Sequence, residues 1–80
     1  MKTIVMSRNN QHVVPFGAGW AVVKEGRKHV SHICTKQSWA IELAKEHAMK
    51  FGAAVIIHGR DEKVRSRKRY PKQEYRARIV

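Results

Sequence analysis

The sequence contains a single cysteine, Cys34, so an intrachain disulfide is excluded. A reducing compartment, the cytoplasm, is therefore the expected location. The chain has no apolar run near the roughly 18 residues that a membrane span needs, and residues 1–11 lack the continuous apolar segment of a signal peptide. Acidic residues are also scarce, since six stand against 17 lysines and arginines and leave a net charge of +11. This surplus favours a polyanionic partner.

No set of residues has the pattern of a catalytic or metal centre. Imidazole and thiolate groups are zinc ligands, but no pair among the histidines and the cysteine has a diagnostic zinc spacing. These side chains are His12, His29, His32, Cys34 and His58. The carboxylates Asp61 and Glu62 are adjacent, which is typical of a turn rather than of a paired site. We therefore predict a protein that is not an enzyme and that has no catalytic residue, no metal site and no cofactor.

The sequence does contain short apolar segments separated by glycines and polar turns. Their alternation predicts five strands, and a segment of strong helix formers without proline or glycine lies among them. The expected elements are strands at 12–16, 20–24 and 29–34, a helix at 36–51, and strands at 53–58 and 63–70. A chain of 80 residues allows one domain with a thin core. The predicted fold is α+β, an antiparallel β-sheet in β-β-β-α-β-β order with one helix packed on one face.

The helix has expected ends and an expected buried face. Thr35 is the predicted N-cap residue, and Gly52 follows the last helical residue as a left-handed C-cap. The buried face repeats at helical spacing, and its small side chains let a helix lie close to a sheet. Its members are Ala40, Ile41, Ala44, Ala48 and Phe51.

Positive charge concentrates toward the C-terminal end of the chain. We expect residues 1–11 to form an edge strand or a frayed end, residues 12–70 to form the α+β domain, and residues 71–80 to form a basic C-terminal tail. Residues 60–80 hold nine lysines and arginines against three acidic residues, a net charge of +6. More than half of the chain's surplus charge therefore lies in its last quarter.

The segment KVRSRKRY, residues 63–70, is the most informative part of that region. In an extended strand, alternate side chains project to opposite sides. One side would carry Lys63, Arg65, Arg67 and Arg69, and the other would carry Val64, Ser66, Lys68 and Tyr70, with Val64 as the inward anchor. Four cations on one strand face make nucleic acid the leading partner, because guanidinium groups suit phosphate oxygens.

The sequence thus predicts non-enzymatic binding of DNA or RNA through the last hairpin and the tail. The expected phosphate ligands are Arg60, Lys63, Arg65, Arg67, Lys68, Arg69, Lys72, Arg76 and Arg78. Tyr70 and Tyr75 are candidates for stacking on unpaired bases, although Tyr70 also suits the core. The alternatives left open are docking of an acidic protein on the same basic face, homodimerisation through an edge strand, and a solvated edge whose charges prevent aggregation. Membrane-surface attachment ranks behind these, since the helix lacks a basic amphipathic face.

Several separated motifs resemble those of one bacterial family. They are HVVP at residues 12–15, GWAV at 19–22, KEG at 24–26 and IHGRD at 57–61. In this order they resemble the family of domain of unknown function 2188, over about residues 12–70. The sequence departs from the family where Glu62 and Lys63 follow Asp61 in place of the usual Asp-Gly turn, and where Trp39 replaces an acidic residue. The resemblance implies the fold and a bacterial or phage origin, and it implies no activity.

Overall fold

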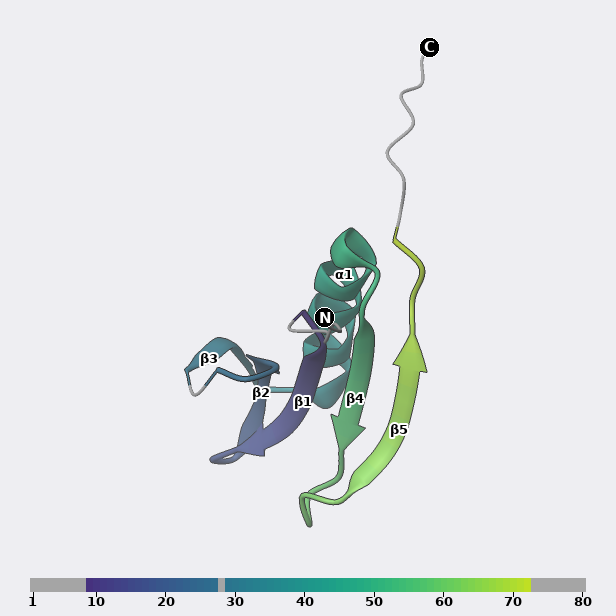
Figure 1. The fold of residues 1–80 in the computed structure, drawn as a ribbon. Helices are drawn as coiled ribbons and strands as arrows, with labels where there is room; N and C mark the ends of the chain where they lie inside the picture. The colour runs from purple at the N-terminus through teal and green to yellow at the C-terminus, as the bar shows by residue number, and fades with distance from the viewer. Residues whose placement is uncertain (1–8, 28, 73–80) are drawn as a thin grey trace.

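The computed structural model describes residues 9–27 and 29–72 of the chain. Its elements follow the predicted β-β-β-α-β-β order, so the α+β class is confirmed (Figure 1). The elements are β1 Gln11–Phe16, β2 Gly19–Lys24, β3 Val30–Cys34, α1 Gln37–Phe51, β4 Ala54–His58 and β5 Val64–Arg69. No helix in these two ranges is long and apolar enough to cross a membrane.

The five strands form one sheet in the order β3-β2-β1-β4-β5. Three neighbouring pairs are antiparallel, but β1 and β4 run parallel, so the sheet is mixed and not wholly antiparallel as expected. The helix explains the difference. Because α1 carries the chain back along the sheet, β4 runs in the same direction as β3. The connection through α1 crosses β2 and β1, and β4 joins the sheet on the far side of β1. The crossover places β4 in the interior of the sheet and leaves β5 as an edge strand.

Helix α1 begins one residue later than the predicted cap allows. Lys36 is the N-cap residue, with extended backbone angles and no side-chain hydrogen bond to the helix, so the prediction of Thr35 is wrong. The backbone at Lys36 is still extended, so the first helical residue is Gln37. The C-cap prediction is confirmed: Gly52 has a φ of 68°, and its N–H donates to the Ala48 carbonyl.

The core lies between α1 and one face of the sheet. Three helix alanines are fully buried there, and their small side chains bring the helix backbone close to the strands. The buried cluster consists of Val13, Trp20, Val22, Ala40, Ala44, Ala48, Ala53 and Val55, with Ile41 packed against it. Phe51 was expected on this face but is 50% exposed, and its ring lies 5.7 Å from the Lys24 ammonium. It occupies the last helical position, beyond the buried turns.

The turn between β4 and β5 contains Glu62, where the sequence departs from the Asp-Gly turn of the family that it resembles. The backbone of Glu62 has an unfavourable conformation. Among the described residues, Glu62 is the non-glycine residue with a positive φ, 67°. An L-residue there is disfavoured by about 1 kcal/mol. Glu62→Gly relieves this backbone conformation but adds conformational entropy to the unfolded chain, and the first effect is the larger. We therefore expect the substitution to raise the free energy of unfolding by about 0.5–1 kcal/mol. Urea denaturation tests this, and an unchanged or lower midpoint would contradict it.

Candidate nucleic-acid interface

Strand β5 lies at one edge of the sheet, and all six of its residues are exposed. Four of the six are basic. Its inner side pairs with β4, whereas its outer side has no strand neighbour in the described part of the chain (Figure 1). The strand therefore offers both cationic side chains and unpaired backbone groups to a partner.

A β-bulge interrupts the predicted single row of cations. Ile57 pairs with Ser66 and His58 pairs with Val64, so Arg65 is the extra residue of the bulge. The bulge places Val64 on the same face of the sheet as His58, and the Val64 residue is 52% exposed there. The prediction that Val64 anchors the strand inward is therefore wrong, and the four cations do not form one uninterrupted row.

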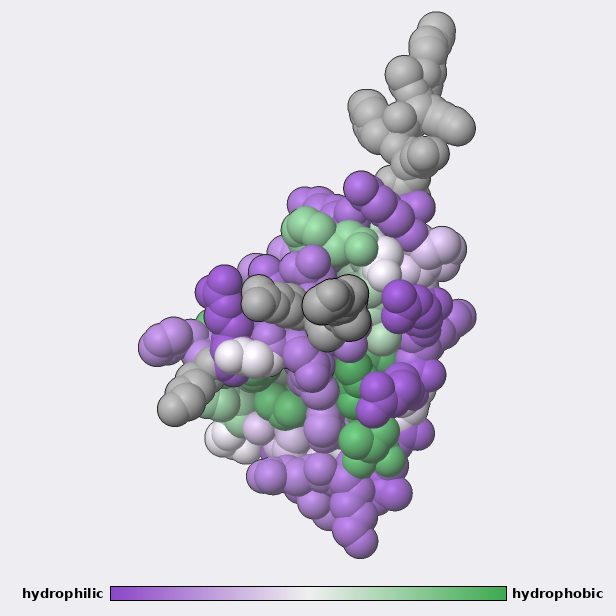
Figure 2. Space-filling view, in the orientation of Figure 1, coloured by the Kyte–Doolittle hydropathy of each residue, from purple (hydrophilic) through white to green (hydrophobic). Residues whose placement is uncertain are grey.

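Two of the predicted arginines do share a face. Arg67 lies opposite Ile56 and Arg69 lies opposite Ala54 in the register of β4 and β5. Val55, which lies between Ala54 and Ile56 on β4, packs toward the helix. Alternation therefore places Ala54 and Ile56, and with them Arg69 and Arg67, on the face that α1 does not cover. This uncovered face is turned to the viewer in Figures 1 and 2.

The other face of β5 lies on the helix side of the sheet, next to the core. Lys68 pairs with Val55 on the helix side of the sheet, and its ammonium lies 5.2 Å from the centre of the Tyr70 ring. Tyr70 is partly buried against the core cluster. Of the two roles considered for Tyr70, the structure favours packing against the core. Tyr75 lies outside the described residues.

Arg60 is occupied by contacts within the protein. Its Nη1 donates to the Gly17 carbonyl at 3.1 Å, and its Nη2 donates to the carbonyls of Ala18 and Gly19 at 2.8 and 3.0 Å. Its guanidinium carbon also lies 4.6 Å from the centre of the Trp20 ring. Arg60 therefore links the β4–β5 turn to the β1–β2 turn, across more than 40 residues of sequence.

This geometry predicts that Arg60 contributes to stability more than to binding. Arg60→Ala removes hydrogen bonds to three carbonyls and a cation–π contact, and we expect it to lower the free energy of unfolding by about 1–2 kcal/mol. Arg60→Lys keeps the charge but cannot reproduce the fork of donors, so it should lose most of the same stability. Thermal unfolding and nucleic-acid titration of both variants test this. A large loss of affinity at unchanged stability would contradict it.

The remaining predicted ligands divide into paired and unpaired groups. Arg65 Nη2 lies 2.8 Å from Asp61 Oδ2, so its charge is partly neutralised. In the described ranges the other close contacts between basic and acidic side chains are Lys45–Glu42 and His12–Glu25, and the latter is an ion pair only when His12 is protonated. Five predicted residues thus have no acidic partner in those ranges, namely Lys63, Arg67, Lys68, Arg69 and Lys72, and all five are exposed. Arg76 and Arg78 lie outside the described residues.

The uncovered face also carries large apolar side chains that the sequence did not single out. Phe16 is 45% exposed and Ile33 is 62% exposed. The strand register places both on this face, together with Val64. Figure 2 shows apolar and charged side chains beside one another here. Alternation alone did not reveal them, because either face of a strand satisfies the same pattern.

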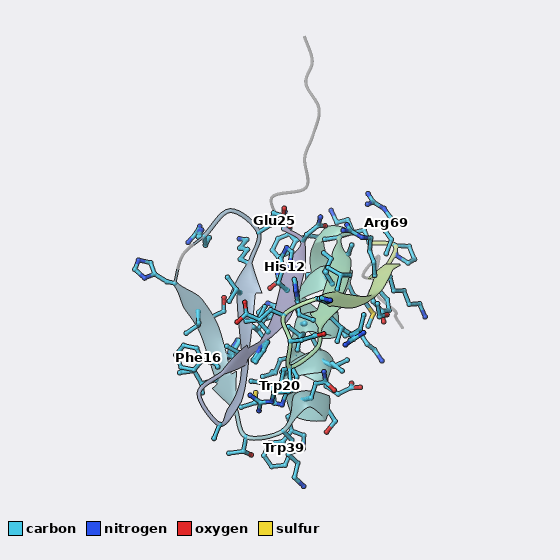
Figure 3. All side chains as sticks on the ribbon, turned by 90° about the horizontal axis from the view of Figure 1, so that it is seen from below. His12, Phe16, Trp20, Glu25, Trp39 and Arg69 are labelled. Atoms are coloured by element: carbon cyan, nitrogen blue, oxygen red, sulfur yellow. The ribbon has the colours of Figure 1, made fainter. Side chains whose placement is uncertain are left out.

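Two pairs of histidines come together that are distant in the sequence. His12 Nδ1 lies 3.0 Å from His58 Nε2. His12 Nε2 lies 2.6 Å from Glu25 Oε1, and both of these residues are labelled in Figure 3. On the helix side, His32 Nε2 lies 3.3 Å from His47 Nε2. In the ranges that the structure covers, no group of three or more histidine, cysteine or acidic side chains is arranged to hold a metal ion.

Burial lowers the pKa of His47 from its ordinary value of 6.5, and the nearby His32 and Lys50 lower it further. The folded protein therefore binds a proton at His47 less readily than the unfolded chain does. The resulting stability is fully present above about pH 6.5 and is lost as the pH falls through 6.5 to the lowered folded value. We expect the free energy of unfolding to fall more in the native protein than in His47→Gln between about pH 7.5 and pH 5.5. Equal losses in urea titrations would contradict this.

The comparisons with known proteins identify the family. A family model described as an uncharacterized protein conserved in bacteria (DUF2188) matches residues 11–70. The chain belongs to this family. The resemblance inferred from the separated motifs is therefore confirmed. The uncharacterized protein YdaT of Bacillus subtilis (strain 168) is 48% identical over 48 residues, which are 60% of this chain and 32% of YdaT. The match thus spans about a third of that relative, and no solved structure matches the chain.

The DUF2188 region contains every described strand and the helix. Six of the nine predicted phosphate ligands lie inside it, including Arg67 and Arg69. Lys72, Arg76 and Arg78 lie beyond its end at residue 70. Strand β5 therefore lies within the region that the family model matches, whereas the last three predicted ligands follow it.

Proposed function

We propose that this DUF2188 protein binds nucleic acid, DNA or RNA, through strand β5, and that it catalyses no reaction on it. The observation that supports the proposal is the combination of full exposure and unpaired charge on β5. Arg67, Lys68 and Arg69 follow one another on an edge strand, and none of them has an acidic partner among the described residues. The proposal includes a cytoplasmic location, which the free thiol of Cys34 suits.

The strand geometry is compatible with contacts to successive phosphates. Arg67 and Arg69 are alternate residues of one strand, so their Cα atoms are about 7 Å apart. That spacing is comparable to the spacing of phosphates along one nucleic-acid strand. Guanidinium groups can donate two hydrogen bonds to each phosphate, and Lys63 and Lys72 extend the charge beyond both ends of β5. Such contacts hold the backbone and carry no direct information about base sequence.

Fluorescence anisotropy of the purified chain against labelled duplex DNA, single-stranded DNA and RNA tests the proposal. We expect binding at physiological salt to at least one of the three. With Arg60 and Arg65 already bound to other groups of the protein, about three to four phosphates should be neutralised, which corresponds to a log–log salt slope of roughly −3 to −4 on duplex DNA. Attraction that is measurable only at low salt for all three ligands would contradict the proposal.

The exposed edge of β5 also supports a second candidate. An acidic protein segment could add to this edge as a further strand, with its carboxylates on the basic side chains and an apolar residue against Val64. This candidate predicts that a partner stays bound after nuclease treatment and that free nucleic acid does not compete for it. The first proposal predicts the opposite result in both measurements.

A further inference from the structure

A row of polar groups crosses the uncovered face of the sheet from the β2–β3 turn to the β4–β5 turn. Its centre is the contact between His12 of β1 and His58 of β4, with 3.0 Å between His12 Nδ1 and His58 Nε2. The outer nitrogen of each ring has its own partner. His12 Nε2 lies 2.6 Å from Glu25 Oε1, and His58 Nδ1 lies 3.3 Å from the Glu62 carbonyl oxygen.

The outer partners determine which nitrogens carry hydrogen. A carboxylate and a backbone carbonyl only accept hydrogen bonds, so His12 Nε2 and His58 Nδ1 must both donate. In neutral rings, the inner nitrogens then carry no hydrogen. Two lone pairs therefore face each other across 3.0 Å. This arrangement is unfavourable unless a cation lies between them.

We propose that His12 and His58 form a binding site for a divalent first-row transition metal ion such as Zn²⁺ or Ni²⁺. Metal-binding histidines typically donate their second N–H to a carboxylate or a backbone carbonyl, which fixes the tautomer and raises the basicity of the ligand. Glu25 and the Glu62 carbonyl provide one of each. Metal–nitrogen bonds of about 2.0–2.1 Å place two imidazole nitrogens roughly 3.3 Å apart at the tetrahedral angle and roughly 2.9 Å apart at a right angle. The observed 3.0 Å lies between these two separations.

The site is accessible and incompletely enclosed. The His12 side chain is 26% exposed and the Glu25 side chain is 45% exposed, so an ion can enter from solvent. Two protein ligands leave coordination positions for water or for an external ligand. The site does not depend on nucleic-acid binding by β5, and either proposal can fail alone.

The second histidine pair provides a matched comparison. His32 and His47 also present facing nitrogens, 3.3 Å apart, on the opposite side of the sheet. Within the described residues, neither ring has a hydrogen bond from its other nitrogen to a carboxylate or carbonyl. Their tautomers are therefore not fixed in the way that the outer partners fix those of His12 and His58.

Isothermal titration of the full chain with Zn²⁺ and with Ni²⁺, in a buffer that does not bind metals, tests the site. We expect one ion per chain. His58→Ala should abolish that binding, and Glu25→Gln should weaken it by about tenfold. His47→Ala should leave it unchanged. Circular dichroism of each variant checks its fold, and nitrogen NMR of the native imidazoles gives a readout that needs no substitution.

The NMR experiment names the ligand atoms directly. Metal should shift the signals of His12 Nδ1 and His58 Nε2 more than those of the outer nitrogens. If neither metal binds and the inner nitrogens share only a proton, the proposal is overturned. Binding that survives His58→Ala but is lost in His47→Ala would also overturn it, because the ion would then belong to the other pair.

Discussion

Replacing Arg67 and Arg69 together by glutamate is expected to weaken nucleic-acid binding by roughly ten- to a hundredfold at physiological salt. Each substitution removes a cation from the uncovered face and adds an anion that repels phosphate. Both side chains are exposed and neither makes an ion pair within the described residues, so the fold should be retained. The salt slope should also fall in magnitude by about two.

A control with the same change in net charge separates a site from general attraction. Lys36 and Lys50 lie at the two ends of α1, on the other layer of the domain, and both are exposed. Their joint replacement by glutamate changes the net charge as much as the Arg67 and Arg69 double variant does. We expect it to reduce affinity much less. Equal losses in anisotropy titrations would show that β5 has no special role and that overall charge alone attracts the ligand.

Gly19→Ala is expected to lower the free energy of unfolding by about 2–4 kcal/mol, a large fraction of the stability of a small domain. A Cβ atom at Gly19 would lie well inside van der Waals contact of the Cys34 carbonyl oxygen and close to the Thr35 Cα. These are backbone atoms at the end of β3, where the chain turns toward α1. They cannot move without disturbing the pairing of Trp20 with Cys34.

Gly26→Ala is the matched comparison for this prediction. Gly26 has a φ of 79°, and nothing lies within 4 Å of a Cβ placed there. Its substitution therefore tests backbone conformation without a steric clash, and we expect a cost of about 1 kcal/mol. Urea denaturation of both variants measures the difference. If Gly19→Ala lowers the free energy of unfolding no more than Gly26→Ala does, then β3 accommodates the added methyl group at little cost.

Strand β5 shows which features a local sequence pattern can predict. Alternation predicted a strand at residues 63–70 with one cationic side and one inward side, and the structure has β5 at Val64–Arg69 with all six residues exposed. The same alternation failed at Val64, because one bulge residue, Arg65, reverses the sides from that point. A bulge depends on the hydrogen bonds that β5 makes with β4 and leaves no periodic signal in the sequence.

Arg60 and the pair His12 and His58 show which contacts a local sequence pattern cannot predict. In sequence, Arg60 is one more cation of a basic segment, yet its donors end on the carbonyls of a turn 41–43 residues away. His12 and His58 are 46 residues apart and meet because β1 and β4 are parallel neighbours. No spacing rule for metal or catalytic motifs covers such a separation, because those rules describe ligands on one local segment.

The sequence by itself determined the family, the order of the elements, the C-cap at Gly52 and the accumulation of positive charge near the end of the chain. These features depend on neighbouring residues, since turns, caps and apolar periodicity act over a few positions. Only the tertiary structure decided that β4 pairs with β1 in parallel, that Arg60 contacts the carbonyls of the β1–β2 turn, and that His12 faces His58. Those outcomes depend on which distant segments pack together, and interactions between residues that are neighbours in the sequence do not specify that packing.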